Sequence, residues 1–331
     1  MLEKNSQLSN ESSHAGGGII SPLHPWRYSS EMLRLASWSH EYFPYLVDKL
    51  ASLSGVAIPL IETGMLVPNT KEAKAALKCN FLRSSILDAN QVYELEPGIA
   101  NPQKSVYVDG VRNVRNPALC KALPIVLQKI GVELKTDFSV ESLDKRNQLF
   151  EIKSQNQLIR AKKVIICAGA WSTELLKLCG ENIKFAMPEI FPVKGQMLAV
   201  KAKLGVLRTV ILEQNRYLIP RHDGIVLVGS TVENKGFDKQ TTQAAQTELL
   251  SFAHAILPAL KQYPVVSHWA GLRPGSHRDK PFICSVPQFD GLYLNTGHFR
   301  NGLLSAPASA QVITDIILNR DSQFDLDAYS I

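Results

Sequence analysis

Residues 163–170 read Lys-Val-Ile-Ile-Cys-Ala-Gly-Ala, a run that is apolar throughout after its first residue. The absence of polar alternation is typical of a parallel strand covered on both faces, with Cys167 packed as a small hydrophobic side chain. Trp171-Ser172-Thr173 directly follows and predicts the start of a helix. Ligands of open α/β sheets bind at such turns, although ordinary strand-to-helix packing explains the pattern equally well. We therefore expect an α/β fold with a candidate ligand turn near residue 170.

Hydrophobic spacing and turn residues predict the other elements. Apolar side chains recur near helical spacing over residues 29–53, where Pro44 predicts a kink. We expect Asn116 to cap a helix that Gly131 ends, and further helices over 241–256 and 301–318. Strands are predicted at 58–67, 132–136, 138–143, 148–154, 157–160, 190–200, 209–213, 217–220, 225–228, 265–272 and 292–295.

This order predicts two discontinuous domains, which a chain of 331 residues can accommodate. Segments 1–54, 116–184 and 286–331 would form a nucleotide-binding, Rossmann-like α/β domain. Segments 55–115 and 185–285 would form an inserted α+β substrate domain with a mostly antiparallel sheet. The predicted fold class is therefore α/β with an inserted α+β domain.

Charge and cysteine usage narrow the function classes. The net charge is +6, and the basic groups at 160–163 and 277–280 are interpreted as solvated faces, not as a nucleic-acid stripe. A basic surface can still favour anionic substrates or a weak membrane contact. The five cysteines show no zinc-ligand spacing, so no metal site is expected. The polar start and the lack of an apolar run of about 18 residues predict a cytoplasmic protein without a transmembrane segment.

Two glycine-containing motifs carry candidate site residues. Ser12-Ser13-His14-Ala15-Gly16-Gly17-Gly18 would let backbone approach a flat ligand closely, although a flexible loop is the simpler interpretation of this stretch alone. Trp269-Ala270-Gly271-Leu272-Arg273-Pro274-Gly275 fixes Arg273 at the end of an apolar strand. Its guanidinium can bind a carboxylate through two parallel hydrogen bonds, or form a structural salt bridge.

A third motif, residues 297–304, reads Gly-His-Phe-Arg-Asn-Gly-Leu-Leu and enters the predicted last helix. A helix N-terminus stabilises negative charge, such as the charge that a reduced flavin carries near N1. The density of Gly, His, Arg and Asn favours a functional site over a decorated loop. Tyr217 lies on an alternating strand, where its hydroxyl would either contact a substrate or take part in cross-strand packing.

Together these motifs resemble the D-amino-acid oxidase superfamily of FAD enzymes, in its glycine oxidase branch. The resemblance extends from Leu2 to about Tyr329 and is strongest at residues 270–274, 280–283 and 296–307. It implies FAD as cofactor and hydride transfer from glycine or another small amino acid or amine, with molecular oxygen as the acceptor. No side chain would act as a catalytic base. It also implies a link to thiamine thiazole synthesis and leaves the oligomeric state open, a homo-oligomer included.

The resemblance also assigns residue roles. Arg273 and Tyr217 match the residues that hold the substrate carboxylate, and Arg300 also faces the substrate. Glu3 matches the carboxylate that binds the ribose hydroxyls. The remaining cofactor contacts would be Ser12, Ser13, Gly16, Gly17, Gly18, Val140, Ala168, Gly169, Trp171, His298, Arg300, Asn301, Gly302, Leu303 and Leu304.

One departure concerns the phosphate-binding loop. In this superfamily a strand and Gly-x-Gly-x-x-Gly precede the ribose carboxylate by about 20 residues, whereas here Glu3 is the third residue. From the printed sequence we expect an unstable chain that binds FAD weakly. A late-assigned start, a broken gene and a fragment needing a second polypeptide would each explain the departure. The alternative functions are a D-amino-acid dehydrogenase that passes electrons to quinone and a non-catalytic remnant.

Overall fold

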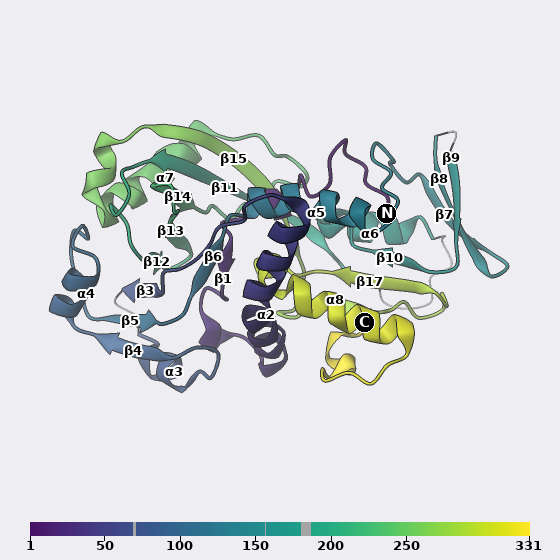
Figure 1. Cartoon of the computed structure of the whole chain (residues 1–331), viewed down its shortest axis with the longest axis horizontal. Coiled ribbons are helices and arrows are strands. Elements are labelled where there is room, and N and C mark those ends of the chain that lie inside the picture. Colours follow the sequence, from purple (N-terminus) through teal and green to yellow (C-terminus); the bar gives the residue numbers. More distant parts are fainter. Residues whose placement is uncertain (69–70, 156, 180–186) are drawn as a thin grey trace.

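The computed structural model describes residues 1–68, 71–155, 157–179 and 187–331. A large sheet occupies one half of the elongated molecule, and the small sheets built from residues 142–166 and 282–296 occupy the other (Figure 1). The long helices α2 (Ser30–Ser54) and α8 (Gly302–Leu318) pack against each other between the two halves. This is the α/β architecture with a mostly antiparallel second sheet that the sequence predicts.

The large sheet has the strand order β15-β11-β14-β13-β12-β3-β5-β4. Its neighbouring strands are antiparallel except for β12 and β3, which are parallel. Helix α7 (Gln243–Ile256) covers one face and buries Leu249 and Phe252 against β11 and β14. The strands are β3 (Met65–Pro68), β4 (Ser84–Leu87), β5 (Ser105–Val108), β11 (Phe191–Lys201), β12 (Val210–Glu213), β13 (Arg216–Pro220), β14 (Ile225–Gly229) and β15 (Val265–Gly275).

A three-stranded sheet contains the apolar run of residues 163–170. Its order is β10 (Val164–Ile166), β17 (Leu292–Thr296) and β16 (Phe282–Ser285), with β10 and β17 parallel. The parallel strand is confirmed, but its burial on both faces is wrong for β10, because Ile165 and Cys167 are exposed. Among the described residues β10 is an edge strand of this sheet, and Ile165 pairs with Tyr293 of β17, which is buried together with residues of α8. The doubly covered strand is therefore β17.

Two further sheets correct the predicted strand positions. Residues 58–67 divide between β2 (Leu60–Glu62) and β3, because Gly64 adopts a positive φ of 63° and turns the chain from one sheet to another. Residues 132–136 form only an isolated bridge between Lys135 and Leu2. The strand expected at 138–143 instead spans 142–146. The sheets are β1 (Ile19–Ile20)-β6 (Arg112–Val114)-β2 and β7 (Ser142–Arg146)-β8 (Leu149–Ser154)-β9 (Gln157–Ala161).

The long helices begin and end at ordinary capping signals. Ser29 caps α2 by accepting a hydrogen bond from the Met32 amide, and Gly55 ends the helix in the left-handed region. Helix α5 (Asn116–Lys129) ends before Gly131 as predicted, but Asn116 is its first helical residue and does not cap it. The shorter helices are α1 (Ser12–Ala15), α3 (Ala73–Lys78), α4 (Ala89–Leu95) and α6 (Ser172–Lys177), with 3-10 turns at Pro25–Arg27, Gly169–Trp171, Pro258–Gln262 and Leu326–Tyr329.

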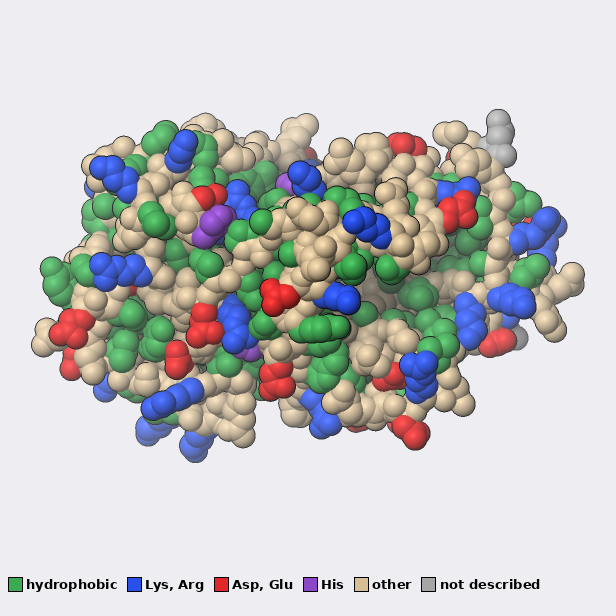
Figure 2. Space-filling model, in the orientation of Figure 1, with side chains coloured by type: hydrophobic (Ala, Val, Ile, Leu, Met, Phe, Trp, Pro, Cys, Tyr) green, Lys and Arg blue, Asp and Glu red, His purple; other side chains and the backbone are tan. Residues whose placement is uncertain are grey.

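Two surface properties bear on function. Lysine and arginine side chains are interspersed with acidic ones over the face shown in Figure 2. Within the described ranges, none of the helices is both long and apolar enough to cross a bilayer. The division into two domains stays a prediction, and its boundary at 184/185 lies outside the described residues.

Candidate active site

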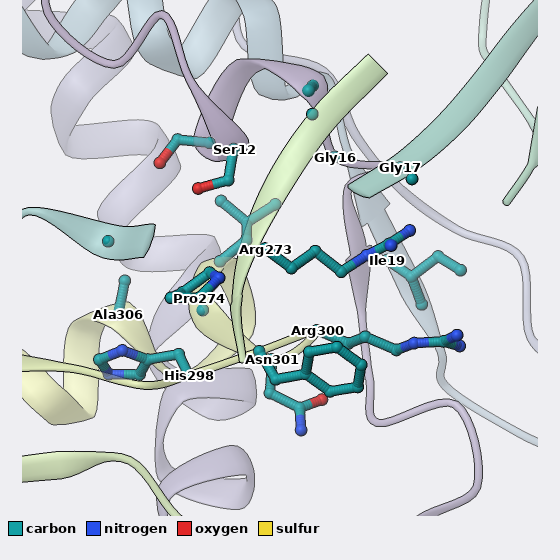
Figure 3. Close-up of a pocket in the computed structure, with 18 of the residues that line it drawn as sticks. Ser12, Gly16, Gly17, Ile19, Arg273, Pro274, His298, Arg300, Asn301 and Ala306 are labelled. Carbon is teal, nitrogen blue, oxygen red and sulfur yellow. The ribbon is translucent and has the colours of Figure 1, made fainter. Parts of the chain in front are cut away.

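A cavity of about 350 Å³ lies where the N-terminal glycines, the end of β15 and the start of α8 meet (Figure 3). This volume falls within the range of small-molecule pockets. It brings together segments that are almost 300 residues apart in the sequence. Of the predicted site residues, those that line it are Ser12, Ser13, Gly16, Gly17, Gly18, Gly169, Tyr217, Arg273, His298, Arg300, Asn301, Gly302 and Leu303.

Arg273 is held firmly at the end of β15. Its Nη2 donates to Ser230 Oγ at 2.6 Å, and its Nη1 approaches the carbonyl oxygens of Lys194 and Thr231 at 3.4 and 3.3 Å. The guanidinium packs directly on Gly195 of β11, where a Cβ would lie 2.2 Å from Nη2. Gly195 therefore makes room for the arginine, a role that the sequence analysis missed.

Arg300 places a second guanidinium beside the first. The two side chains extend in the same direction along the cavity wall (Figure 3). Burial lowers the pKa of Arg300, and the neighbouring charge of Arg273 lowers it further. Among the described residues, no carboxylate counteracts this repulsion, and the buried Arg300 Nε has no hydrogen-bond partner. This pair of cations therefore favours an anionic ligand.

Tyr217 of β13 faces the same cavity. Among the residues that the structure describes, its hydroxyl contacts the Met197 sulfur alone, at 3.8 Å, and a thioether is a weak acceptor. The ring is otherwise buried. The hydroxyl can therefore donate to a bound ligand without losing a strong bond within the protein.

The glycine loop, residues 12–18, packs closely against this cavity wall. A Cβ on Gly17 would lie 2.7 Å from Ile219 Cδ1, and one on Gly18 would lie 2.2 Å from the Val114 carbonyl oxygen. Gly18 also has a positive φ of 74°. The backbone at these positions can therefore reach the cavity only without side chains, which favours the close-approach interpretation of this motif over a flexible loop.

The turn into α8 is tied to the arginine strand. Phe299, which has a positive φ of 47°, donates its amide to Pro274 O at 2.9 Å. Asn301 precedes the helix without a side-chain cap, so the first helix amides remain available at the cavity. Those amides and the positive end of a 17-residue helix favour negative charge.

His298 contributes an uncharged ring to the same turn. Its Nε2 lies 3.0 Å from Ser309 Oγ, and burial lowers its pKa to about 4. Because the unfolded chain binds a proton near pH 6.5 and the folded chain does not, the stability associated with neutral His298 is lost as the pH falls from 6.5 to about 4. We expect that loss to approach about 3 kcal/mol.

Denaturant unfolding of the wild type and of His298→Gln at several pH values between 4 and 7 checks this expectation. The variant should show a smaller loss of unfolding free energy across that interval. Equal losses in the two proteins would contradict the assignment to His298.

The predicted cofactor residues outside the cavity are connected to it through chain neighbours and contacts. Gly169 lines the cavity, and the nearby Trp171 ring lies 3.0 Å from Lys4 Nζ. The Glu3 carbonyl accepts from the Phe138 amide at 2.9 Å, two residues before Val140. Ala168 is adjacent to Gly169 and packs against a hydrophobic cluster. The Leu304 side chain is buried in another cluster, so a ligand at the start of α8 would meet only the backbone of this residue.

A family model described as FAD dependent oxidoreductase matches residues 1–316. The chain belongs to this family. It is 39% identical to the glycine oxidase of Pseudomonas aeruginosa, over 99% of this chain and 91% of that protein. It is 29% identical to the bifunctional protein ThiO/ThiG of Trichormus variabilis, over 93% of this chain and 47% of that one.

Solved structures agree with the family assignment. The crystal structure of glycine oxidase from Geobacillus kaustophilus has a TM-score of 0.92 at 25% identity, covering 99% of this chain and 90% of that one. The predicted family and fold are thereby confirmed, and the chain is an FAD-dependent enzyme. The cavity fits that cofactor, because its glycine loop has no room for side chains, the N-terminus of α8 has no side-chain cap, and the buried Arg300 Nε has no hydrogen-bond partner among the described residues.

Proposed function

We propose that this protein oxidatively deaminates glycine or another small amino acid or amine, with molecular oxygen as the final acceptor. The observation that carries the proposal is the pair of guanidinium groups on one cavity wall with no carboxylate beside them in the described chain. A carboxylate of an amino acid supplies the missing charge. The similarity to glycine oxidases supports the same substrate class.

Arg273 anchors the substrate carboxylate, because three hydrogen bonds to the protein already fix the orientation of its guanidinium. Arg300 adds charge, and the Tyr217 hydroxyl donates a further bond. These contacts leave the amine and the Cα–H directed toward the glycine loop and the α8 turn, where the described residues fit the flavin. FAD, when bound there, supplies the two-electron acceptor for a hydride from Cα. The residues contribute orientation and charge stabilisation and no proton-abstracting base.

The cofactor contacts predicted from the sequence remain part of this proposal. Glu3 would bind the ribose, and the ADP portion would contact Val140, Ala168, Gly169 and Trp171. The flavin would lie along Ser12, Ser13 and Gly16 to Gly18. Its pyrimidine edge would face Arg300, Asn301, Gly302, Leu303 and Leu304, and the cofactor contact of neutral His298 would add no charge of its own. A place in thiamine synthesis and a cytoplasmic location also stay proposals, the first supported by the similarity to a ThiO/ThiG protein.

Oxygen consumption and peroxide formation by the FAD-containing protein test this function. With glycine or sarcosine in air, we expect stoichiometric peroxide without any added electron acceptor. Reduction of an artificial quinone analogue without peroxide would instead indicate the dehydrogenase alternative. Failure of every small amine to support either reaction would contradict the proposed function.

A further inference from the structure

A third arginine, Arg221, is buried behind the cavity wall and is not among the predicted site residues. It directly follows β13, is 4% exposed, and makes no ion pair within the described chain. Burial, together with a smaller contribution from the nearby Arg115, lowers its pKa to about 10, and the group stays charged at neutral pH. The nearest acid, Asp223, is paired with Arg115 at 3.0 Å.

Neutral oxygens from two separate segments bind this guanidinium. Nη2 donates to the Gly17 carbonyl at 2.9 Å and to Asn116 Oδ1 at 3.2 Å. Nη1 donates to the Val114 carbonyl at 2.7 Å and to Asn113 Oδ1 at 3.0 Å. Arg221 therefore joins the end of β13 to the glycine loop and to the junction between β6 and α5.

Asn116 extends this connection along the loop. Its Nδ2 donates to the carbonyl oxygens of Ser13 and His14 at 3.0 and 2.7 Å. Arg221 and Asn116 together thus bind three backbone carbonyls between residues 13 and 17. This explains why Asn116 does not cap α5, because its side chain is directed to the loop.

The other side of the glycine loop contacts the strand that carries Tyr217, so the hydrogen bonds of Arg221 also bear on the position of Tyr217. Gly17 packs against Tyr217 and Ile219, which lie on the strand that Arg221 follows. The separation between the glycine loop and Tyr217 is therefore set by the Gly17 packing and by the Arg221 hydrogen bond. A buried charge without an ionic partner is poor evidence for a stabilising role, and its Nε has no hydrogen-bond partner in the described chain.

We propose that Arg221 is a positioning residue, which holds the Gly16–Gly18 backbone against the strand carrying Tyr217 and so aligns the substrate with the cofactor. The kinetic consequence of this inference rests on the proposed function. The structural consequence, a fixed position of the glycine loop, is independent of that function. When Arg221 is replaced, the loop itself is kept, but it loses its fixed position relative to Tyr217.

Rapid-reaction kinetics of the FAD-containing protein test the alignment. On anaerobic mixing with glycine, Arg221→Met should lower the limiting rate of flavin reduction by about 100-fold, the scale of a misplacement near 1 Å. The apparent dissociation constant for glycine should change much less, because Arg273 still binds the carboxylate. Arg221→Lys, which keeps the charge and some of the donors, should recover part of the rate.

Two further variants separate positioning from general destabilisation. Asn116→Ala removes the bonds to Ser13 and His14 and should shift the reduction rate in the same direction as Arg221→Met. Arg115→Gln removes a neighbouring half-exposed arginine and should leave the rate unchanged. Wild-type reduction rates in Arg221→Met and Asn116→Ala, or equal loss of rate and glycine affinity, would overturn the proposal.

Hydrogen exchange of the protein without FAD provides a readout independent of the reaction. Amides of residues 12–18 should exchange faster in Arg221→Met and Asn116→Ala than in the wild type or Arg115→Gln. Unchanged exchange in this segment would overturn the positioning role. If glycine does not reduce the wild-type flavin, the proposed function fails, while the exchange experiment still decides the role of Arg221.

Discussion

Replacing Arg273 by methionine is expected to lower kcat/KM for glycine by about 100- to 1,000-fold. Removing one partner of a hydrogen-bonded charge pair generally costs about 2–5 kcal/mol or more, and a 100- to 1,000-fold loss corresponds to about 3–4 kcal/mol, in the middle of that range. The loss should appear mainly as a raised KM, because the guanidinium binds the carboxylate before and during the reaction. The kcat/KM of Arg273→Lys should lie between the values of the wild type and Arg273→Met, since an ammonium keeps the charge without the parallel pair of bonds.

A substrate that lacks the carboxylate provides the matched control. Ethylamine presents an amine and a Cα–H but nothing for Arg273 to bind, so its already low kcat/KM should be almost the same in the wild type and in Arg273→Met. Equal losses for glycine and ethylamine would show that Arg273 maintains the fold of the cavity and does not anchor the substrate. A larger loss for glycine in Arg300→Met than in Arg273→Met would transfer the anchoring role to Arg300.

Replacing Gly195 by alanine is expected to lower kcat/KM for glycine by about 100-fold or more, although the new methyl group reaches no substrate. The added Cβ would lie 2.2–2.4 Å from three atoms of the Arg273 guanidinium, far inside van der Waals contact. The arginine must leave its bonds to Ser230 and Thr231, and a displacement near 1 Å is enough for such a loss. Steady-state kinetics with glycine measures the effect.

A double-mutant cycle identifies the cause. If Gly195→Ala acts through the guanidinium, it should have little further effect on kcat/KM once Arg273 is methionine. Additive losses would contradict this mechanism. The circular dichroism spectrum and the thermal unfolding of Gly195→Ala should stay close to those of the wild type, because the Arg273 side chain has room to move toward the cavity. The same room is available to the methionine that replaces Arg273 in the double variant.

The sequence predicts the chemistry-bearing residues better than the residues that arrange them. Arg273 and Tyr217 are recognisable through the family resemblance of their motifs, since the residues alone also allow a structural salt bridge and cross-strand packing, whereas the density of Gly, His, Arg and Asn around Arg300 itself favours a site. The structure brings all three to one cavity. Their roles toward a substrate remain proposals, since the geometry shows only that they lie together.

Gly195 and Arg221 could not be assigned from the sequence for a different reason. Gly195 matters only because the guanidinium of a residue 78 positions later packs on it, a contact that strand pairing between β11 and β15 creates. Arg221 follows Tyr217 closely, but its acceptors lie at residues 17 and 113–116. No local pattern encodes such long-range contacts.

Errors in the predicted strands have similar causes. The apolar run at 164–166 does form a parallel strand, but the run does not reveal that β10 is an edge strand of its sheet in the described chain and that Ile165 is exposed. The strand predicted over 58–67 contains a glycine at position 64, and its positive φ divides the segment between two sheets. That glycine was the available signal for the division.

Anaerobic addition of glycine to the FAD-containing protein tests the central claim most directly. If paired arginines hold an amino-acid carboxylate so that Cα faces the flavin, the long-wavelength flavin band should bleach at a rate that saturates with glycine, and air should restore it. In Arg273→Met the same bleaching should require far higher glycine concentrations. A protein that binds FAD and yet keeps its oxidised spectrum with glycine and other small amino acids would contradict the account.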